Sequence, residues 1–165
     1  MMEFELREIP EHIAYTAEYD VKSYNDFFDF ETGENYLQNL EDLMHEENPD
    51  VVVPEIPDDY NYFTHPKGEV PQGKMHMKYY DMVDRKGKDN KEGKYKFVTV
   101  PGVKAVVVPW QGANSTIPQG IGEALSLAKK NGFEIAGDTR VSAIHGPWDR
   151  DDENEYLVEI QVPVK

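Results

Sequence analysis

An internal repeat constrains the fold of this chain more than any other feature of its sequence. Residues 9–19 read IPEHIAYTAEY and residues 100–110 read VPGVKAVVVPW, and the two stretches align without a gap. Further on, YFTHP at residues 62–66 aligns with SAIHGP at residues 142–147 once a single residue is inserted. Two copies are too few for a solenoid, so we expect them to pair about a pseudo-twofold axis with a cleft at their junction.

Each copy has the order strand, helix, strand, strand. The first helix is predicted over residues 34–47, where an apolar stripe runs until Pro49 stops it. The second helix begins at Ser115 or Thr116, either of which can cap it, and ends near Gly132. Strands are predicted at residues 2–7, 13–19, 58–65, 74–83, 96–100, 103–110, 140–145 and 156–164.

This order predicts an α+β fold in which two pseudo-symmetric strand–helix–strand–strand repeats form an antiparallel sheet, with one long helix per repeat. A single domain spans residues 1–165. Repeat one covers about 1–84, repeat two covers 95–165, and the charged, glycine-bearing stretch 85–94 links them. Pro10 is expected to bend an edge strand, because proline cannot donate to the ladder.

The last predicted strand separates a structural face from a candidate functional face. Tyr156, Val158, Ile160, Val162 and Val164 alternate with Leu157, Glu159, Gln161 and Pro163. The first set is continuously apolar and requires a helix to cover it, whereas the second set carries a carboxylate and an amide. Function is therefore expected on the face that holds Glu159.

Composition excludes several classes of function. The chain has 165 residues, a formal net charge of −15 and no cysteine, so disulfides, thiol chemistry and cysteine zinc sites are ruled out. That charge repels phosphate backbones and membrane headgroups, and it favours either solubility or the attraction of cationic ligands. With no apolar run of membrane-spanning length, we expect a cytoplasmic protein that contacts neither nucleic acid nor membrane.

No catalytic or cofactor motif is present. The chain lacks a Ser–His–Asp elbow, a phosphate-binding loop and a dinucleotide fingerprint. The acidic loop Asp149–Glu155 lacks the spacing of a calcium loop. His65 and His145 occupy equivalent repeat positions, but two histidines without a third ligand do not predict a metal site. We expect neither a cofactor nor a metal.

Aromatic residues provide the candidate binding site. Tyr19 and Trp110 are equivalent in the repeat and end the two central strands, so they are expected to form opposite walls of a pocket. The alternative is that each packs in the core of its own half. Tyr15 shares a face with Tyr19, and Trp148 in the last hairpin is either a lid or a surface aromatic. The full candidate set is Tyr15, Tyr19, Tyr62, Trp110, His145, Trp148 and Glu159.

Several stretches resemble the GyrI-like domain, also called the AraC-type effector-binding domain. They are Val103–Trp110 with Gly112, AKKNG at 128–132, GDTR at 137–140, and the run of residues 155–164. The resemblance covers nearly the whole chain and implies two strand–helix–strand–strand repeats. Members bind lipophilic, often cationic, small molecules in an aromatic pocket between the halves. Some free-standing relatives protect DNA gyrase, and some hydrolyse strained cyclopropane-bearing toxins.

The chain departs from similar drug sensors at one position. Those sensors place a buried glutamate on the strand that matches Arg140–Ile144, which here reads RVSAI and holds no acid. Glu159 on the neighbouring strand is the nearest substitute. A regulator of this family would also carry a DNA-binding helix-turn-helix. With strand sequence starting at Phe4, none is expected, and so no direct contact with DNA.

The sequence therefore predicts a free-standing protein that binds a small, amphipathic, cationic molecule. We expect it to release that molecule unchanged, as a binding protein does, and not to convert it as an enzyme would. Tyr19 and Trp110 would supply stacking and cation–π contacts, with Glu159 as counter-charge. Three alternatives stay open: a hydrolase of strained electrophiles that uses Glu159 as acid or base, an interaction module that binds a protein such as gyrase through its acidic surface, and a subunit that regulates a separate DNA-binding chain.

Overall fold

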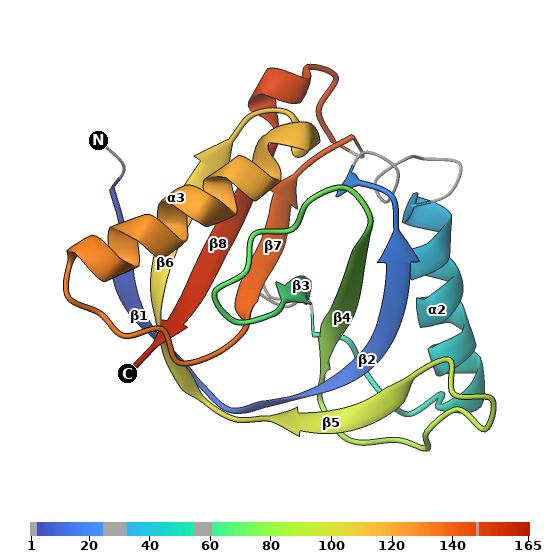
Figure 1. Cartoon of the computed structure of the whole chain (residues 1–165). Coiled ribbons are helices and arrows are strands. Elements are labelled where there is room, and N and C mark those ends of the chain that lie inside the picture. The colour runs from blue at the N-terminus through green and yellow to red at the C-terminus, as the bar shows by residue number, and fades with distance from the viewer. Residues whose placement is uncertain (1–2, 25–32, 55–60, 148) are drawn as a thin grey trace.

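The described strands of this protein all belong to one antiparallel sheet, and the two described α-helices pack against it (Figure 1). The computed structural model describes residues 3–24, 33–54, 61–147 and 149–165. The strands are β1 (Glu5–Ile9), β2 (His12–Val21), β3 (Asn61–His65), β4 (Met75–Val83), β5 (Lys96–Val100), β6 (Val103–Gln111), β7 (Thr139–His145) and β8 (Leu157–Val164). The helices are α2 (Gly33–Glu47) and α3 (Ile117–Lys130), with short 3-10 turns at Asn114–Thr116 and Glu153–Glu155. The predicted α+β class is confirmed.

The order of the strands divides the sheet into two halves. It runs β1-β6-β8-β7-β3-β4-β2-β5, so the strands of the first half (β2, β3, β4) and the second half (β6, β7, β8) meet where β3 pairs with β7. Each half is extended by a strand that precedes the other half in the chain: β1 pairs with β6, and β5 pairs with β2. The superposition of the halves stays a prediction.

The stretches aligned in the repeat do not form single bent strands. Each divides at its proline, Pro10 or Pro101, and the two resulting strands join opposite halves of the sheet. The cause is local, because proline has no N–H with which to continue a ladder. The edge position expected for the first strand is confirmed, since β1 lies at one end of the sheet and β5 at the other.

One row of buried side chains shows which face carries the core. Cross-strand partners follow one another through the sheet in the order Val108, Ile160, Val141, Phe63, Tyr79 and Ala17. All six belong to the same core cluster as Leu40 and Met44 of α2 and Ile121 and Leu125 of α3. Both helices therefore pack on this side, which we call the helix face.

The start of α3 differs from the prediction. Thr116 makes no side-chain cap to the helix. Its hydroxyl instead donates to the carbonyl of Ala113 at 2.6 Å and accepts from Nε1 of Trp110 at 2.9 Å. The hydroxyl of Thr116 thus bonds to the preceding turn and to Trp110 of β6, and it does not cap the helix. The end of the helix is as predicted, because Gly132 has a φ of 81°, a conformation that favours glycine at this place.

Candidate functional site

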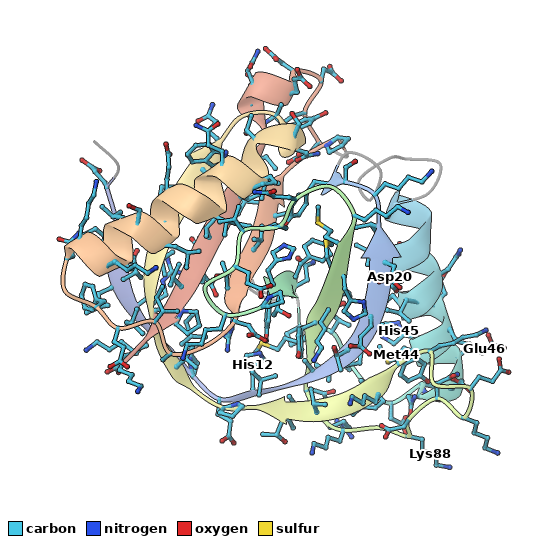
Figure 2. All side chains as sticks on the ribbon, viewed as in Figure 1. His12, Asp20, Met44, His45, Glu46 and Lys88 are labelled. Carbon is cyan, nitrogen blue, oxygen red and sulfur yellow. The ribbon has the colours of Figure 1, made fainter. Side chains whose placement is uncertain are left out.

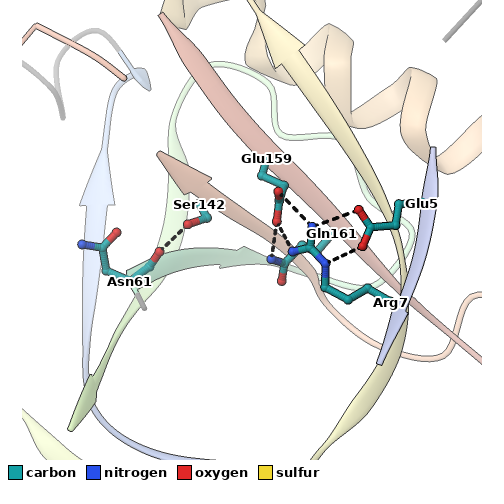
Figure 3. Close-up of polar contacts among 6 residues, drawn as sticks. All are labelled: Glu5, Arg7, Asn61, Ser142, Glu159 and Gln161. Atoms are coloured by element: carbon teal, nitrogen blue, oxygen red, sulfur yellow. Dashed lines mark hydrogen bonds and ion pairs between the residues drawn. The ribbon is translucent and has the colours of Figure 1, made fainter. Parts of the chain in front are cut away.

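The face opposite the helices is polar yet partly buried. Its central row of cross-strand partners contains Val107, Gln161, Arg140 and Thr64, and all four are buried. Side chains alternate between faces along a strand, so neither described helix covers them. The sheet itself is strongly curved, as Figure 1 shows, and Gln161 of this row points to the concave side together with Glu159 (Figure 3). We call this side the concave face.

Two tyrosines and an arginine form a stack on the concave face. Tyr62 of β3 lies parallel to Tyr80 of β4, with ring centroids 5.1 Å apart and an angle of 13° between the planes. On the neighbouring strand β7, Cζ of Arg140 lies 5.0 Å from the centroid of the Tyr62 ring. Because β4, β3 and β7 are adjacent in that order, Tyr62 stands between the other two. The arrangement combines aromatic stacking with a cation–π contact.

His12 fixes the orientation of Tyr62. It lies within the curve of the sheet (Figure 2), where Nε2 is 2.7 Å from the Tyr62 hydroxyl and Nδ1 is 3.1 Å from the carbonyl of Pro10. Since a carbonyl only accepts, Nδ1 of neutral His12 donates and Nε2 accepts from the hydroxyl. Burial lowers the pKa of His12, and the charge of Arg140 adds to that lowering. The neutral imidazole therefore holds Tyr62 in place at neutral pH.

A cavity of about 430 Å³ lies beside this stack. Its polar lining includes Tyr62, Tyr80 and Arg140, and its apolar lining comes from the crossover between β5 and β6 and from β8. The residues of that apolar part are Val100, Gly102, Val103, Pro163 and Val164. A cavity of this size, lined by both polar and apolar groups, suits a small amphipathic ligand.

Glu159 lies on the same concave face, where it is paired (Figure 3). Nη1 of Arg7 donates to Oε1 of Glu159 at 2.6 Å, and Nη2 donates to Oε2 at 3.3 Å. Gln161 adds a bond from Nε2 to Oε1 at 3.1 Å. Glu5 binds the outer side of Arg7 at 3.0 Å. The charge predicted to receive a cation thus already has a guanidinium against it, delivered by strand β1.

Trp110 lies on the opposite face from Glu159. In the pairing of β6 with β8, Glu159 stands opposite Pro109, and Trp110 stands opposite Val158. The indole packs against α3, where a Cβ added to Gly120 would come within 2.6 Å of it. The structure therefore does not bring the predicted aromatic wall and the predicted counter-charge together.

Tyr15 and Tyr19 also lie on the helix face, on the side of α2. The buried hydroxyl of Tyr15 donates to Oδ2 of Asp81 at 2.7 Å. Tyr19 is partly buried and lines a larger, open cavity of about 1290 Å³ between α2 and the strands β2 and β5. Tyr80 lines both cavities.

His145 does not line the concave cavity. Nδ1 of His145 is 2.8 Å from Oδ2 of Asp149, in the turn that follows β7. His65 pairs with Thr139 at the opposite end of β7, so the two histidines do not meet. Trp148 lies outside the described residues. Across residues 3–24, 33–54, 61–147 and 149–165, no group of three acidic, histidine or cysteine side chains could hold a metal ion.

Sequence reasoning missed Tyr80, Arg140 and Arg7 as members of the site. The signal that could have identified Arg140 is a lone arginine among the uncharged residues TRVSAI of the predicted strand. No comparable signal marks Arg7, because its position depends on β1 pairing with a strand about a hundred residues later.

Comparison with known proteins places the fold. The chain matches no protein-family model and no curated protein significantly. It does match solved structures over its full length. The C-terminal domain of EcmrR aligns with 100% of this chain and 98% of its own, at 22% identity and a TM-score of 0.84. In the EcmrR–DNA complex, this chain spans 57% of the EcmrR chain, at 24% identity and a TM-score of 0.80.

Two further structures widen the comparison. SAV2435 bound to tetraphenylphosphonium aligns with 99% of this chain and 94% of its own, at 18% identity and a TM-score of 0.56. A hydrolase from Listeria innocua aligns with 99% of this chain and 92% of its own, at 11% identity and a TM-score of 0.60. The chain therefore has the GyrI-like fold expected from the sequence. Because binding proteins and a hydrolase share this fold, function must be argued from the site.

Proposed function

We propose that this protein binds a lipophilic, aromatic small molecule in the cavity on the concave face. The observation that carries the proposal is the stack of Tyr80, Tyr62 and Arg140 beside a cavity of about 430 Å³ whose lining is partly apolar. Flat aromatic surfaces next to apolar walls bind aromatic ligands by burial and stacking, without covalent chemistry. The likeness of the fold to SAV2435, which was solved with tetraphenylphosphonium, supports a ligand of this kind.

The charge of the ligand needs separate treatment. A cation held by Glu159, as the sequence predicts, would have to displace Arg7, whose Nη1 is only 2.6 Å from the carboxylate. A charge-assisted contact of this length contributes more than a neutral hydrogen bond. We therefore define the ligand class by its apolar, aromatic part, and positive charge is not required of it.

The hydrolase alternative has less support at this site. A catalytic carboxylate must reach the reacting proton, and both oxygens of Glu159 accept bonds from Arg7. Binding through the acidic surface to a protein partner stays open, as does partnership with a separate DNA-binding chain, but no geometry in the described residues favours either.

Calorimetric titration with tetraphenylphosphonium and with uncharged 2-naphthamide tests the proposal. We expect saturable binding of at least one probe, and a loss of roughly 1 kcal/mol of its binding free energy in Tyr80→Ala, as for a stacked pair. Phe4→Ala is the matched control, because Phe4 is an exposed aromatic that packs on Phe133, away from the cavity. Equal losses in the two variants would contradict this location.

A further inference from the structure

Arg140 is buried without the partners that a buried arginine normally has. The residue is 7% exposed, and its Nη1 is shielded from solvent and has no hydrogen-bond partner. The described residues also offer it no ion pair. Burying a charged group costs free energy unless an opposite charge or hydrogen bonds compensate for it. The cation–π contact with Tyr62 supplies only part of this compensation.

No carboxylate of the described residues forms an ion pair with Arg140. Asp138 is the acidic residue among those that line the cavity, and its Oδ1 accepts from the backbone N–H of Lys67 at 3.0 Å. Glu159, the acid on the adjacent part of the concave face, is bound by Arg7. Lys104 adds a second positive charge to the lining. The lining of the cavity thus holds two cations, one carboxylate and an apolar part.

Arg140 also occupies the position that a cationic ligand would take on Tyr62. One side of that ring faces Tyr80 and the guanidinium lies over it from β7. A second cation at this place would meet the charge of Arg140 within a partly desolvated site, where repulsion is stronger than in water. The net charge of −15 attracts cations at long range, but salt screens it beyond about 8 Å at physiological ionic strength.

We propose that Arg140 anchors the negative group of the ligand, and that the ligand class is aromatic carboxylic acids. The planar guanidinium presents paired N–H donors that match a carboxylate, while the aromatic part of the ligand lies against Val103 and Pro163. This inference rests on the proposed function and specifies its ligand. Arg140 lies on β7, the strand that joins the two halves of the sheet by pairing with β3. Its charge then determines which ligands the cavity selects.

Three probes of the same planar shape test the charge preference. They are 2-naphthoate, neutral 2-naphthamide and cationic 2-naphthamidine, titrated into the whole protein at physiological salt. We expect naphthoate to bind at least tenfold more tightly than naphthamide, and naphthamidine to bind most weakly. Equal affinities, or preference for naphthamidine, overturn the assignment of Arg140 while leaving the proposed function intact. If none of the three binds and tetraphenylphosphonium also fails, the proposed function itself is wrong.

A substitution then assigns the preference to the residue. Arg140→Met keeps the length of the side chain and removes its charge, and we expect it to abolish the preference for naphthoate while naphthamide still binds. Arg85→Met is the matched control, because the side chain of Arg85 is 61% exposed. A preference for naphthoate that persists in Arg140→Met overturns the proposal. Should that variant not fold, Arg140→Lys decides instead: loss of at least fivefold in naphthoate affinity is expected, since lysine keeps the charge without the paired donors.

Discussion

Asp81 is the buried acid among the described residues, and its pKa lies near neutral. It is 5% exposed on the helix face and accepts a hydrogen bond from Tyr15. Burial raises its pKa to about 7, opposed in part by that hydrogen bond. The folded protein therefore keeps a proton on Asp81 at pH values where the unfolded chain has lost it. Stability contributed by this group is present at low pH and is lost as pH rises from about 4 through about 7.

Asp81→Asn should remove that dependence. The amide still accepts from Tyr15 and carries no charge, so we expect the variant to be more stable than the parent at pH 8. At pH 5 the difference should shrink by on the order of 2 kcal/mol. Urea denaturation at the two pH values measures it, with exposed Asp151→Asn as a control that leaves the slope unchanged. A parent whose stability rises between pH 5 and 8 while Asp81→Asn follows it would contradict the prediction.

The ion pair between Arg7 and Glu159 leads to a second prediction, on the affinity for a cationic ligand. If the guanidinium blocks the carboxylate, Arg7→Met should raise the affinity for tetraphenylphosphonium by roughly 1 kcal/mol, the scale of a partly exposed ion pair. Adding Glu159→Gln to Arg7→Met should remove the gain. Isothermal titration of the single and double variants makes the comparison. An identical gain with and without Glu159 would show that Arg7 acts by occupying space alone.

Among the elements, α3 packs closely on the sheet because Gly120 has no side chain. A Cβ on Gly120 would lie 2.6 Å from the Trp110 ring and 3.0 Å from Ile160. Gly120→Ala gains helix propensity of about 1 kcal/mol, but overpacking costs roughly 1–3 kcal/mol, so we expect net destabilisation. The smaller side chain of Trp110→Leu should relieve the penalty in the double variant.

Gly122 in the same helix is the matched control for this change. Its added Cβ would meet only Val70, at an ordinary contact distance of 3.6 Å. Gly122→Ala should therefore stabilise the protein by up to about 1 kcal/mol, in the direction opposite to Gly120→Ala. Chemical denaturation of Gly120→Ala, Trp110→Leu, their double variant and Gly122→Ala measures both effects on the free energy of unfolding. Stabilisation by both alanines would mean that the indole moves aside freely.

The elements were predictable because their signals are local. Proline and glycine marked the ends of the helices, and alternation marked most strands within one or two residues. The first strand was predicted at residues 2–7 and lies at Glu5–Ile9, so its start was three residues off. The composition of the site was not predictable in the same way. Tyr62 and Arg140 meet because β3 pairs with β7. The 77 residues between them contain no signal from which that pairing and its register could be predicted. Equivalence in the repeat placed Tyr19 and Trp110 correctly at strand ends, but it did not indicate that both face the helices.

At the scale of the whole molecule, the two halves are expected to superpose. The strand orders β5-β2-β4-β3 and β1-β6-β8-β7 correspond position by position, and in the described residues each half carries one long helix on the same face. We predict that β2, α2, β3 and β4 overlay β6, α3, β7 and β8 by a rotation of about 180°, with Tyr19 on Trp110. An experimental structure checks this directly; helices that cross their sheets at unrelated angles would refute it.

The crossing of β1 and β5 between the halves has a consequence for how the molecule holds together. Each half completes the other's sheet, as in a domain swap confined within one chain. A polypeptide cut in the stretch 85–94 would yield two fragments, each carrying a strand that belongs to its companion. Such fragments should reassemble only as a pair, and a ligand in the concave cavity, which touches the crossover at Gly102 as well as Tyr62 and Arg140, would strengthen that fragment complementation.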